Sequence, residues 1–262
     1  MVNGVVSQAY ENIQKNICAL QQKWRKQVDA SALVSKVIDA NVPLLAHNVL
    51  SIPAQQYQTF MLELTDFLQE NKVNAELDFS KIKKLVEIEG GSDTFVANAL
   101  TVNLSYFHEL AQEYGTSEQM VHVIAEHGIR PFLQAFSAHI GDSLTDVAAP
   151  HSCKVCGEPF RLAIFNDKKV VTCTRCYSQF QEKRLKCSHC DNDDHTHLRV
   201  LKVENDEQHE VLACEKCNGY MKIITTSEKL DELIPDLLDL QTIHLDIIAQ
   251  DNGFGGNDSS EQ

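Results

Sequence analysis

The stretch RLKCSHCDNDDH, Arg184–His195, contains two cysteines separated by two residues. The same spacing recurs in SCKVCGEP from Ser152, TCTRCYSQ from Thr172 and ACEKCNGY from Ala213. Eight of the nine cysteines therefore fall in four pairs. The ninth, Cys18, lies in an apolar helical pattern and is expected to be a small buried side chain. Four copies of the pair indicate metal ligation, because a redox-active dithiol requires only one.

Successive pairs are expected to combine, since two such pairs supply four thiolates to one tetrahedral site. This pairing leaves room for a hairpin within each site: FRLAIF and KVVT flank ND in the first interval, and LRVLKV and HEVLA flank ENDEQ in the second. The sequence thus predicts two metal ions. Their predicted ligands are Cys153, Cys156, Cys173 and Cys176 for the first ion, and Cys187, Cys190, Cys214 and Cys217 for the second.

The short length of the cysteine-rich segments supports the same interpretation. Residues 151–186 and 187–226 each form a module of at most about 40 residues, a size at which a chain needs a metal, disulfides or a partner to fold. A structural zinc ion contributes on the order of 10 kcal/mol or more to folding. Iron and zinc both suit four sulfur ligands, so the choice between them stays open. Gly157, Asn218 and Gly219 follow the second cysteine of their pairs, where tolerance of positive φ is useful.

Other chemistry at these residues is less favoured. A thioredoxin-type pair needs a helix N-terminus beside a βαβ pattern, whereas these pairs flank predicted strands. Because eight cysteines fill two four-coordinate sites, His151, His189, His195 and His197 are expected to be turn or solvent-facing residues. The sequence contains no nucleophile-elbow, HExxH, P-loop or dinucleotide motif, so no catalytic residue and no organic cofactor are predicted.

The first half of the chain has helical periodicity. Apolar residues recur every three or four positions from Ile13 to Val28 and from Tyr57 to Leu68, which predicts two helices with buried faces. A third long helix is expected from the N-cap Ser92 to Gly115. Ser117 is expected to cap a fourth helix that ends at Gly128, and Pro131 to begin another that ends near Gly141.

These patterns predict an α+β fold: an N-terminal all-α helical bundle followed by two tandem rubredoxin-like or zinc-ribbon metal modules and a C-terminal helix. Turn-prone residues from Gly141 to His151 form the expected linker. Pro235 is expected to kink the C-terminal helix or restart it, and the helix to pack on the bundle. The predicted parts are a helical domain 1–145, modules 151–186 and 187–226, a helix 228–250 and a mobile tail 253–262.

The charge distribution argues against nucleic-acid binding. The chain carries a net charge of -14, and both ends are acidic while the cysteine-rich part is nearly neutral. Such a chain lacks the positive surface that supplies most non-specific affinity for DNA or RNA. No apolar run approaches the roughly 20 residues that span a bilayer, and the N-terminal segment does not read as a secretory signal. A cytoplasmic protein without membrane insertion is expected.

The cysteine-rich half resembles a known family. The order CKVCGEP, RLKCSHCD and ACEKCNGYMKI, followed by a long acidic and apolar helix, is similar to the formate dehydrogenase accessory protein family, FdhE type. The resemblance covers roughly Cys153 to the end of the chain, and all eight cysteine positions are occupied. It implies a helical region ahead of two rubredoxin-like modules, iron at the cysteine sites, and binding to the catalytic subunit of formate dehydrogenase.

The resulting expectation is a non-enzymatic maturation factor, or chaperone, for a molybdenum or tungsten formate dehydrogenase. Two other classes stay open. One is a zinc-ribbon module that binds nucleic acid or protein, and the other is a rubredoxin-like electron carrier, which would require iron because zinc has no redox chemistry.

Overall fold

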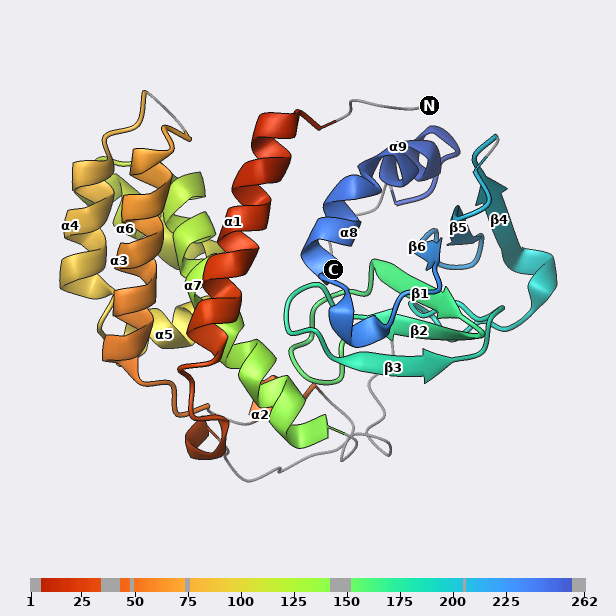
Figure 1. The fold of residues 1–262 in the computed structure, drawn as a ribbon, viewed down its shortest axis with the longest axis horizontal. Coiled ribbons are helices and arrows are strands. Elements are labelled where there is room, and N and C mark those ends of the chain that lie inside the picture. Colours follow the sequence, from red (N-terminus) through yellow and green to blue (C-terminus); the bar gives the residue numbers. More distant parts are fainter. Residues whose placement is uncertain are drawn as a thin grey trace. The chain divides into compact units, whose positions relative to one another are not determined.

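The computed structural model of the chain describes residues 6–33, 43–47, 50–73, 76–141, 152–204 and 206–255 (Figure 1). These residues fall into two compact units. The helical unit comprises Lys15–Lys36 and Val49–His139, and the ribbon unit comprises Met1–Gln14, Val37–Asn48 and Ile140–Gln262. None of the helices in the described ranges combines the length and apolar composition that a bilayer crossing requires.

The helical unit is built from amphipathic helices that share an aromatic core. The indole of Trp24 stacks on Phe60 with ring centroids 5.0 Å apart, and Phe60 contacts Phe132 at 5.3 Å. The Tyr57 hydroxyl donates to the carbonyl of Ala125 at 2.9 Å. The two predicted apolar stripes therefore do form core faces. The elements are α1 (Gln8–Arg25), which begins in the ribbon unit, η1 (Ala30–Leu33), α3 (Ala54–Glu70), α4 (Phe79–Glu89), α5 (Asp93–Leu100), α6 (Leu104–Tyr114) and α7 (Glu118–Ile140).

The prediction of a single helix between Ser92 and Gly115 is wrong, because the segment forms two helices, α5 and α6. Ser92 does cap the start, with its Oγ accepting from the backbone N–H of Phe95, and Gly115 does end it at φ 60°. Between α5 and α6, however, Val102 takes a positive φ of 54° and Asn103 caps α6. The apolar spacing runs across this break, so periodicity alone does not reveal it.

The prediction that one helix ends at Gly128 and another begins at Pro131 is also wrong, because α7 runs through both residues without a break. Proline has no backbone N–H, so the carbonyl of His127, four residues earlier, loses its helical donor. The Nε2 amide of buried Gln21 replaces it, donating to His127 O at 3.0 Å. Gly128 lies at a close approach, since a Cβ there would stand 2.8 Å from Cγ of Met61.

The side chain of His127 completes this contact. Burial lowers the pKa of His127 to about 3, so the ring is neutral at ordinary pH. Nδ1 of a neutral ring can accept a hydrogen bond, and Gln21 Nε2 lies 3.1 Å from it. One amide group on α1 thus satisfies two groups on α7.

Replacing Gln21 with alanine is expected to lower the free energy of unfolding by about 1–3 kcal/mol, because a buried carbonyl loses its donor. Urea unfolding followed by the fluorescence of Trp24, the single tryptophan, reports on this unit. The control is Gln56→Ala, since Gln56 also donates to a carbonyl, that of Gln27, but at the surface. Equal midpoints for the two variants would contradict the role given to Gln21.

The ribbon unit contains a six-stranded sheet within the described residues, with strand order β3-β2-β1-β6-β5-β4 (Figure 1). Two of its pairings are the predicted hairpins, β1 with β2 and β4 with β5. The pairing of β1 with β6 is parallel and joins the two halves. The strands are β1 (Leu162–Asn166), β2 (Lys168–Thr172), β3 (Gln179–Glu182), β4 (Leu198–Lys202), β5 (His209–Cys214) and β6 (Tyr220–Thr225).

The C-terminal region packs on this sheet, and its expected packing on the bundle stays a prediction. After η4 (Leu230–Glu232), Pro235 occupies the first turn of α8 (Pro235–Gln241), and α9 (Ile243–Asp251) follows. Leu245 and Ala249 of α9 are fully buried in a cluster with Val211 and Ala213 of β5. Beyond α9, Phe254 packs against the same cluster, and the backbone N–H of Gly255 donates to Asn218 O at 2.8 Å.

Two buried lysines hold the ribbon unit together. The Lys222 side chain, 1% exposed, lies on β6, and its Nζ contacts Asp239 Oδ1 at 2.6 Å and Asp246 Oδ2 at 2.8 Å, which ties α8 and α9 to the sheet. The Lys169 side chain, fully buried on β2, pairs with Glu182 at 3.1 Å and donates to the carbonyl of Lys186 at 2.8 Å. Lys169 thus links the first hairpin to the residue before the third cysteine pair.

The short helix α2 (Leu44–His47) also belongs to the ribbon unit. Its first two backbone N–H groups, of Leu44 and Leu45, donate to the carbonyls of Lys154 and Val155 at 2.9 and 3.0 Å. Most of the predicted linker, residues 142–151, lies outside the described residues, as does the end of the tail from residue 256. The domain limits given by the sequence stay predictions.

Candidate metal centres

The structure brings together the four cysteines predicted for the first site. One sulfur from each lies within 4.8 Å of the others. Sγ of Cys153 stands 3.5 Å from Sγ of Cys176, and Sγ of Cys156 stands 3.6 Å from Sγ of Cys173. Cys153, Cys173 and Cys176 are at most 2% exposed. Cys153 and Cys156 precede β1, and Cys173 and Cys176 follow β2, so the two cysteine pairs meet at the open end of the β1–β2 hairpin.

The second predicted set converges in the same way. Sγ of Cys187 lies 3.6 Å from Sγ of Cys217, and Sγ of Cys190 lies 3.6 Å from Sγ of Cys214. Four sulfur atoms again fall within 4.8 Å of one another. The sequential pairing of the cysteine pairs is the one that the fold produces. All nine cysteines lie in described segments and none of them forms a disulfide; Cys18 is buried on α1.

These distances fit a shared tetrahedral cation. A disulfide requires sulfurs about 2.05 Å apart. Four sulfurs around one ion with bonds of about 2.3 Å are separated by about 3.8 Å, close to the contacts of 3.5–3.6 Å in both clusters. Burial is the main cause that raises the pKa of the Cys187 thiol, so its thiolate form needs a neighbouring cation. The residues present thus suit either Zn²⁺ or iron.

The backbone around the pairs explains why the sulfurs converge. In each knuckle the N–H of the first cysteine donates to the carbonyl five residues later: Cys153 to Glu158, Cys173 to Ser178, Cys187 to Asn192 and Cys214 to Gly219, at 2.8–3.0 Å. The residue after the second cysteine has a positive φ in all four, namely Gly157, Tyr177, Asp191 and Asn218, at 58–79°. This turn points both thiols of a pair inward.

Sequence reasoning found only part of this turn. Gly157 and Asn218 have the expected positive φ, but Tyr177 and Asp191 adopt it as well, although a tyrosine there gives no local signal. Gly219 is not among the positive-φ residues. Its role is a close approach, since a Cβ would stand 3.1 Å from Cγ of His189 and 3.4 Å from Sγ of Cys217.

Hydrogen bonds to sulfur differ between the two clusters. Backbone N–H groups of Val155 and His189 each point at the first cysteine of their pair, 3.4 Å from the sulfur. Only the first cluster has a hydroxyl among the described contacts: Oγ of Ser178 lies 3.0 Å from Sγ of Cys153 and 3.2 Å from Sγ of Cys176. Such donors stabilise negative charge on sulfur and tune a bound metal.

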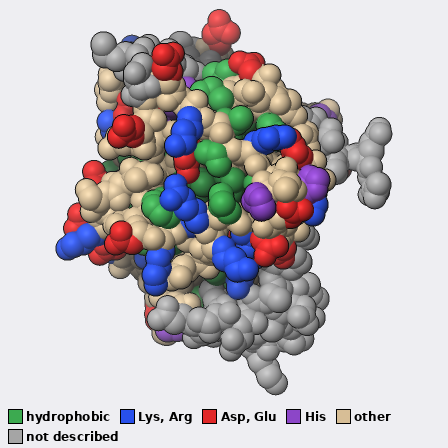
Figure 2. All heavy atoms as spheres, turned by 90° about the vertical axis from the view of Figure 1, so that its right-hand side faces the viewer, with side chains coloured by type: hydrophobic (Ala, Val, Ile, Leu, Met, Phe, Trp, Pro, Cys, Tyr) green, Lys and Arg blue, Asp and Glu red, His purple; other side chains and the backbone are tan. Residues whose placement is uncertain are grey.

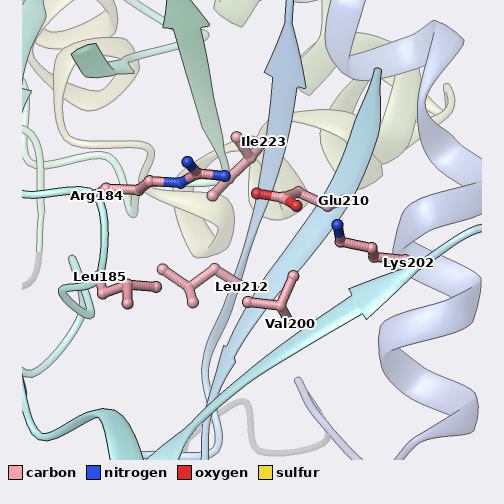
Figure 3. Close-up of a pocket in the computed structure, with 7 residues that line it drawn as sticks. All are labelled: Arg184, Leu185, Val200, Lys202, Glu210, Leu212 and Ile223. Carbon is pink, nitrogen blue, oxygen red and sulfur yellow. The ribbon is translucent and has the colours of Figure 1, made fainter. Parts of the chain in front are cut away.

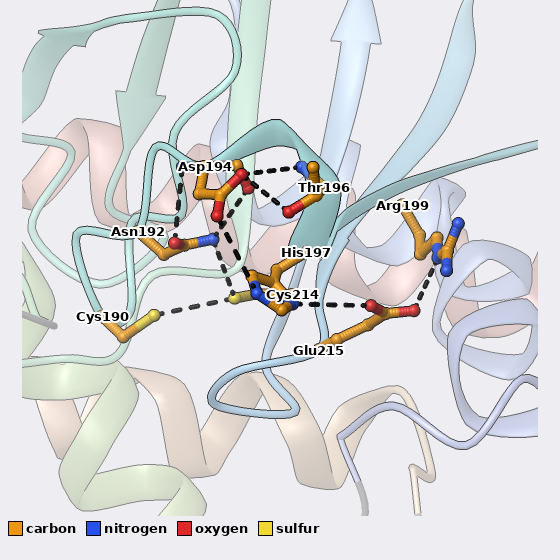
Figure 4. Close-up of polar contacts among 8 residues, drawn as sticks. All are labelled: Cys190, Asn192, Asp194, Thr196, His197, Arg199, Cys214 and Glu215. Carbon is orange, nitrogen blue, oxygen red and sulfur yellow. Dashed lines mark hydrogen bonds and ion pairs between the residues drawn. The ribbon is translucent and has the colours of Figure 1, made fainter.

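The second cluster has an amide and a network of charges beside it (Figure 4). Nδ2 of Asn192 lies 3.9 Å from Sγ of Cys214 and donates to the carbonyl of Asp194. The adjacent Glu215 accepts from Arg199 Nε at 2.6 Å and lies 3.9 Å from Nδ1 of His197. These contacts fix the loop that follows Cys190 against the fourth cysteine pair.

The three described histidines near the cysteines lie outside the two sulfur clusters. Nε2 of His189 lies 3.0 Å from the carbonyl of Tyr220. His195 is exposed and, with His197, belongs to the short turn η3 (His195–His197). His151 lies outside the described residues. The expected turn and surface roles hold for the three that are described.

The two clusters also differ in exposure. The first has three buried cysteines and one half-buried one, Cys156. In the second, Cys190 is half-buried and Cys217 is exposed. Water and small molecules therefore reach the sulfurs of the second cluster more easily.

Comparison with known proteins gives a family match over the part of the chain that contains the second cluster. Residues 185–259, which contain the second cluster, match the family described as "FdhE, C-terminal domain". A "Protein FdhE homolog" from Aquifex aeolicus is 27% identical over 148 residues, which cover 54% of this chain and 52% of the relative. One from Stutzerimonas stutzeri is 32% identical over 113 residues, which cover 39% and 35% of the two chains. The C-terminal part of the chain is thus similar to the C-terminal domain of FdhE proteins.

A solved structure extends the likeness to the fold. The crystal structure of the FdhE protein from Pseudomonas aeruginosa aligns with a TM-score of 0.58 and 16% identity, and covers 91% of this chain and 83% of that one. The matched part of the chain spans about half or less of the length of the FdhE relatives above, between 35% and 52%. The α+β architecture of helices followed by two cysteine modules is thus the fold of an FdhE protein.

Cys173→Ser and Cys214→Ser are each expected to reduce the metal bound at the cysteine clusters from two equivalents to one, because each removes a ligand from one cluster. Metal content by mass spectrometry of anaerobically purified protein measures this. The matched control is Cys18→Ser, which should keep both equivalents. Loss of metal from both clusters in one single variant would show that they do not fold as separate sites.

A chelator is expected to remove metal in two phases. The second cluster should lose its ion first, because Cys217 is exposed while three sulfurs of the first cluster are buried. A chromogenic chelator added to wild type follows the release, and Cys173→Ser, which keeps only the second cluster, should show only the fast phase. A slow single phase in that variant would refute the assignment.

Proposed function

We propose that this protein is a non-enzymatic accessory protein that matures a formate dehydrogenase by binding its catalytic subunit, and that its eight paired cysteines hold two metal ions. The observation that carries the proposal is the match of residues 185–259 to the FdhE C-terminal domain, because that segment contains a complete four-cysteine cluster and the C-terminal helices, of which α9 packs on the sheet. The metal ions have a structural role in this proposal: they hold the knuckles that shape the ribbon surface.

The sheet offers one face for such a partner. Strand residues alternate between its two sides, so Val211 and Ala213 face α9. Glu210 and Leu212, which alternate with them along β5, line a hollow of about 330 Å³ on the opposite face of the sheet, shown in Figure 3. Its floor is apolar, with Val200 43% and Leu185 48% exposed. The lining residues are Arg184, Leu185, Val200, Lys202, Glu210, Leu212 and Ile223.

Charge suggests what binds there. Figure 2 shows hydrophobic side chains on this side of the molecule with Lys and Arg side chains around them. Two of the lining residues, Arg184 and Lys202, are basic, although the chain as a whole has a net charge of -14. An apolar floor with basic neighbours complements a partner segment that carries apolar side chains between acidic ones. In the proposal this segment belongs to the catalytic subunit.

Anaerobic purification of the tagged full-length protein from its native host is expected to recover the catalytic subunit of a molybdenum or tungsten formate dehydrogenase. Mass spectrometry identifies the partner, and metal analysis of the same sample distinguishes iron from zinc. Recovery of a ribosome, a polymerase or nucleic acid instead would overturn the proposal. Retention on heparin at physiological salt would point the same way.

Val200→Glu is expected to weaken capture of the catalytic subunit at least about tenfold, because it places a charge in the centre of an apolar contact. The control is Ile88→Glu, which changes an exposed isoleucine, 57% accessible, on the helical unit. Both variants should keep two equivalents of metal. Equal capture by the two would leave the catalytic subunit as partner but move its contact away from this hollow.

A further inference from the structure

Outside the two cysteine clusters, one further group of metal-binding side chains comes together in the described residues. Asp206 lies in the turn between β4 and β5, His209 is the first residue of β5, and His244 is the second residue of α9. Each offers one ligand atom, and the three atoms lie within 4.8 Å of one another. All three side chains are half-buried.

The turn holds Asp206 in place. Its Oδ1 accepts from the backbone N–H of Gln208 at 2.9 Å and from that of His209 at 3.1 Å. Its Oδ2 lies 2.7 Å from Nδ1 of His209. The backbone bonds and His209 lower the pKa of the Asp206 carboxyl even though burial acts in the opposite direction, so the group is an anion. A carboxylate beside a histidine both orients the ring and supplies an oxygen ligand.

The hydrogen bond between Asp206 and His209 lies within one turn and does not explain why His244, on α9, also lies beside them. The rings of His209 and His244 meet edge to face with centroids 5.8 Å apart. Burial, followed by the nearby His209, lowers the pKa of His244, so its ring is neutral and keeps a lone pair.

The surrounding core fixes this arrangement. His244 precedes Leu245, and His209 lies two residues before Val211; both of these apolar side chains are fully buried in the cluster that joins α9 to β5. The positions of the two histidine backbones therefore follow from packing, and only the side chains need to adjust. Donors around an ion with bonds of about 2.0–2.1 Å lie about 3.4 Å apart, so small ring rotations would bring the present distances, all within 4.8 Å, to that value.

We propose that Asp206, His209 and His244 form a third metal site, which takes a divalent transition metal such as Zn²⁺ through one oxygen and two nitrogen ligands. This donor set differs from the two sulfur sites: imidazole and carboxylate suit Zn²⁺, Fe²⁺, Ni²⁺ and Cu²⁺ and do not require a thiolate. Three protein ligands leave a fourth position for water or an anion. Binding displaces the proton shared by Asp206 and His209 and ties α9 to the β4–β5 turn.

The test is a titration of the full-length protein loaded with two equivalents of zinc, one for each cysteine cluster. Added Co²⁺ should bind as one further equivalent and give a visible spectrum without the intense thiolate charge-transfer bands that cobalt shows at cysteine sites. In Asp206→Asn, and in the double variant His209→Ala with His244→Ala, this equivalent should bind more than about 100-fold more weakly.

Two controls keep the outcome clear. His195→Ala removes an exposed histidine outside the group and should leave the additional equivalent unchanged. Two equivalents of zinc retained by every variant show that the ribbon unit remains folded, so a lost equivalent is not caused by unfolding. Absence of a third equivalent in wild type, or its persistence in the double histidine variant, would overturn the proposal. The inference does not depend on the proposed accessory function.

Discussion

The parallel pairing of β1 with β6 is the constraint on which the ribbon unit depends. Each cysteine module alone is a hairpin with two knuckles and too little apolar surface for a core of its own. The β1–β6 ladder joins the two hairpins into one sheet, with Leu162 opposite Lys222 and Phe165 opposite Thr225. One face of the joined sheet then becomes wide enough to be covered by α9, and the other forms the hollow lined by Val200 and Leu212. Two local metal-binding motifs thus become a single rigid surface.

Buried charge reinforces the same junction. Lys169 belongs to the first module, yet its ammonium reaches the carbonyl of Lys186 and Oγ of Ser188 in the third knuckle. Burial lowers the pKa of Lys169, while Glu182 and the nearby Cys187 favour its charged form. A buried ion pair contributes little net stability. An arrangement of the modules that separated the two charges would, however, leave each of them buried without a partner, at a cost of several kcal/mol. Lys169 therefore sets the register between the modules.

The sequence specified the cysteine centres well because their determinants are local. Spacing of two residues brings two thiols to one point whatever surrounds them, and the hairpins between pairs are visible as apolar runs around turn residues. The pairing of β1 with β6 was not visible, since it joins residues far apart in the chain and no local signal encodes it. The positive φ of Tyr177 and Asp191 could not be predicted either, because the fold of the knuckle imposes it on residues whose side chains do not favour it.

The helical half shows how tertiary contacts override local rules. Pro131 reads as the start of a helix, but Gln21 on a distant helix supplies the donor that the proline lacks, so α7 continues. Between α5 and α6 the apolar spacing reads as one helix, but Val102 and Asn103 break it. In both cases the chain pattern gave the buried face correctly and the helix limits wrongly, because burial follows periodicity whereas limits follow single hydrogen bonds.

The ammonium of Lys222 has a consequence for shortened forms of the chain. Asp239 and Asp246, which neutralise it, stand on α8 and α9, while the lysine itself lies in the middle of the sheet. A premature stop before residue 239 would leave an uncompensated cation inside the sheet, at a cost of about 3–5 kcal/mol. The last helices are therefore not a removable appendage, and a frameshift near the 3′ end of the reading frame would act as a folding defect rather than as a trimmed terminus.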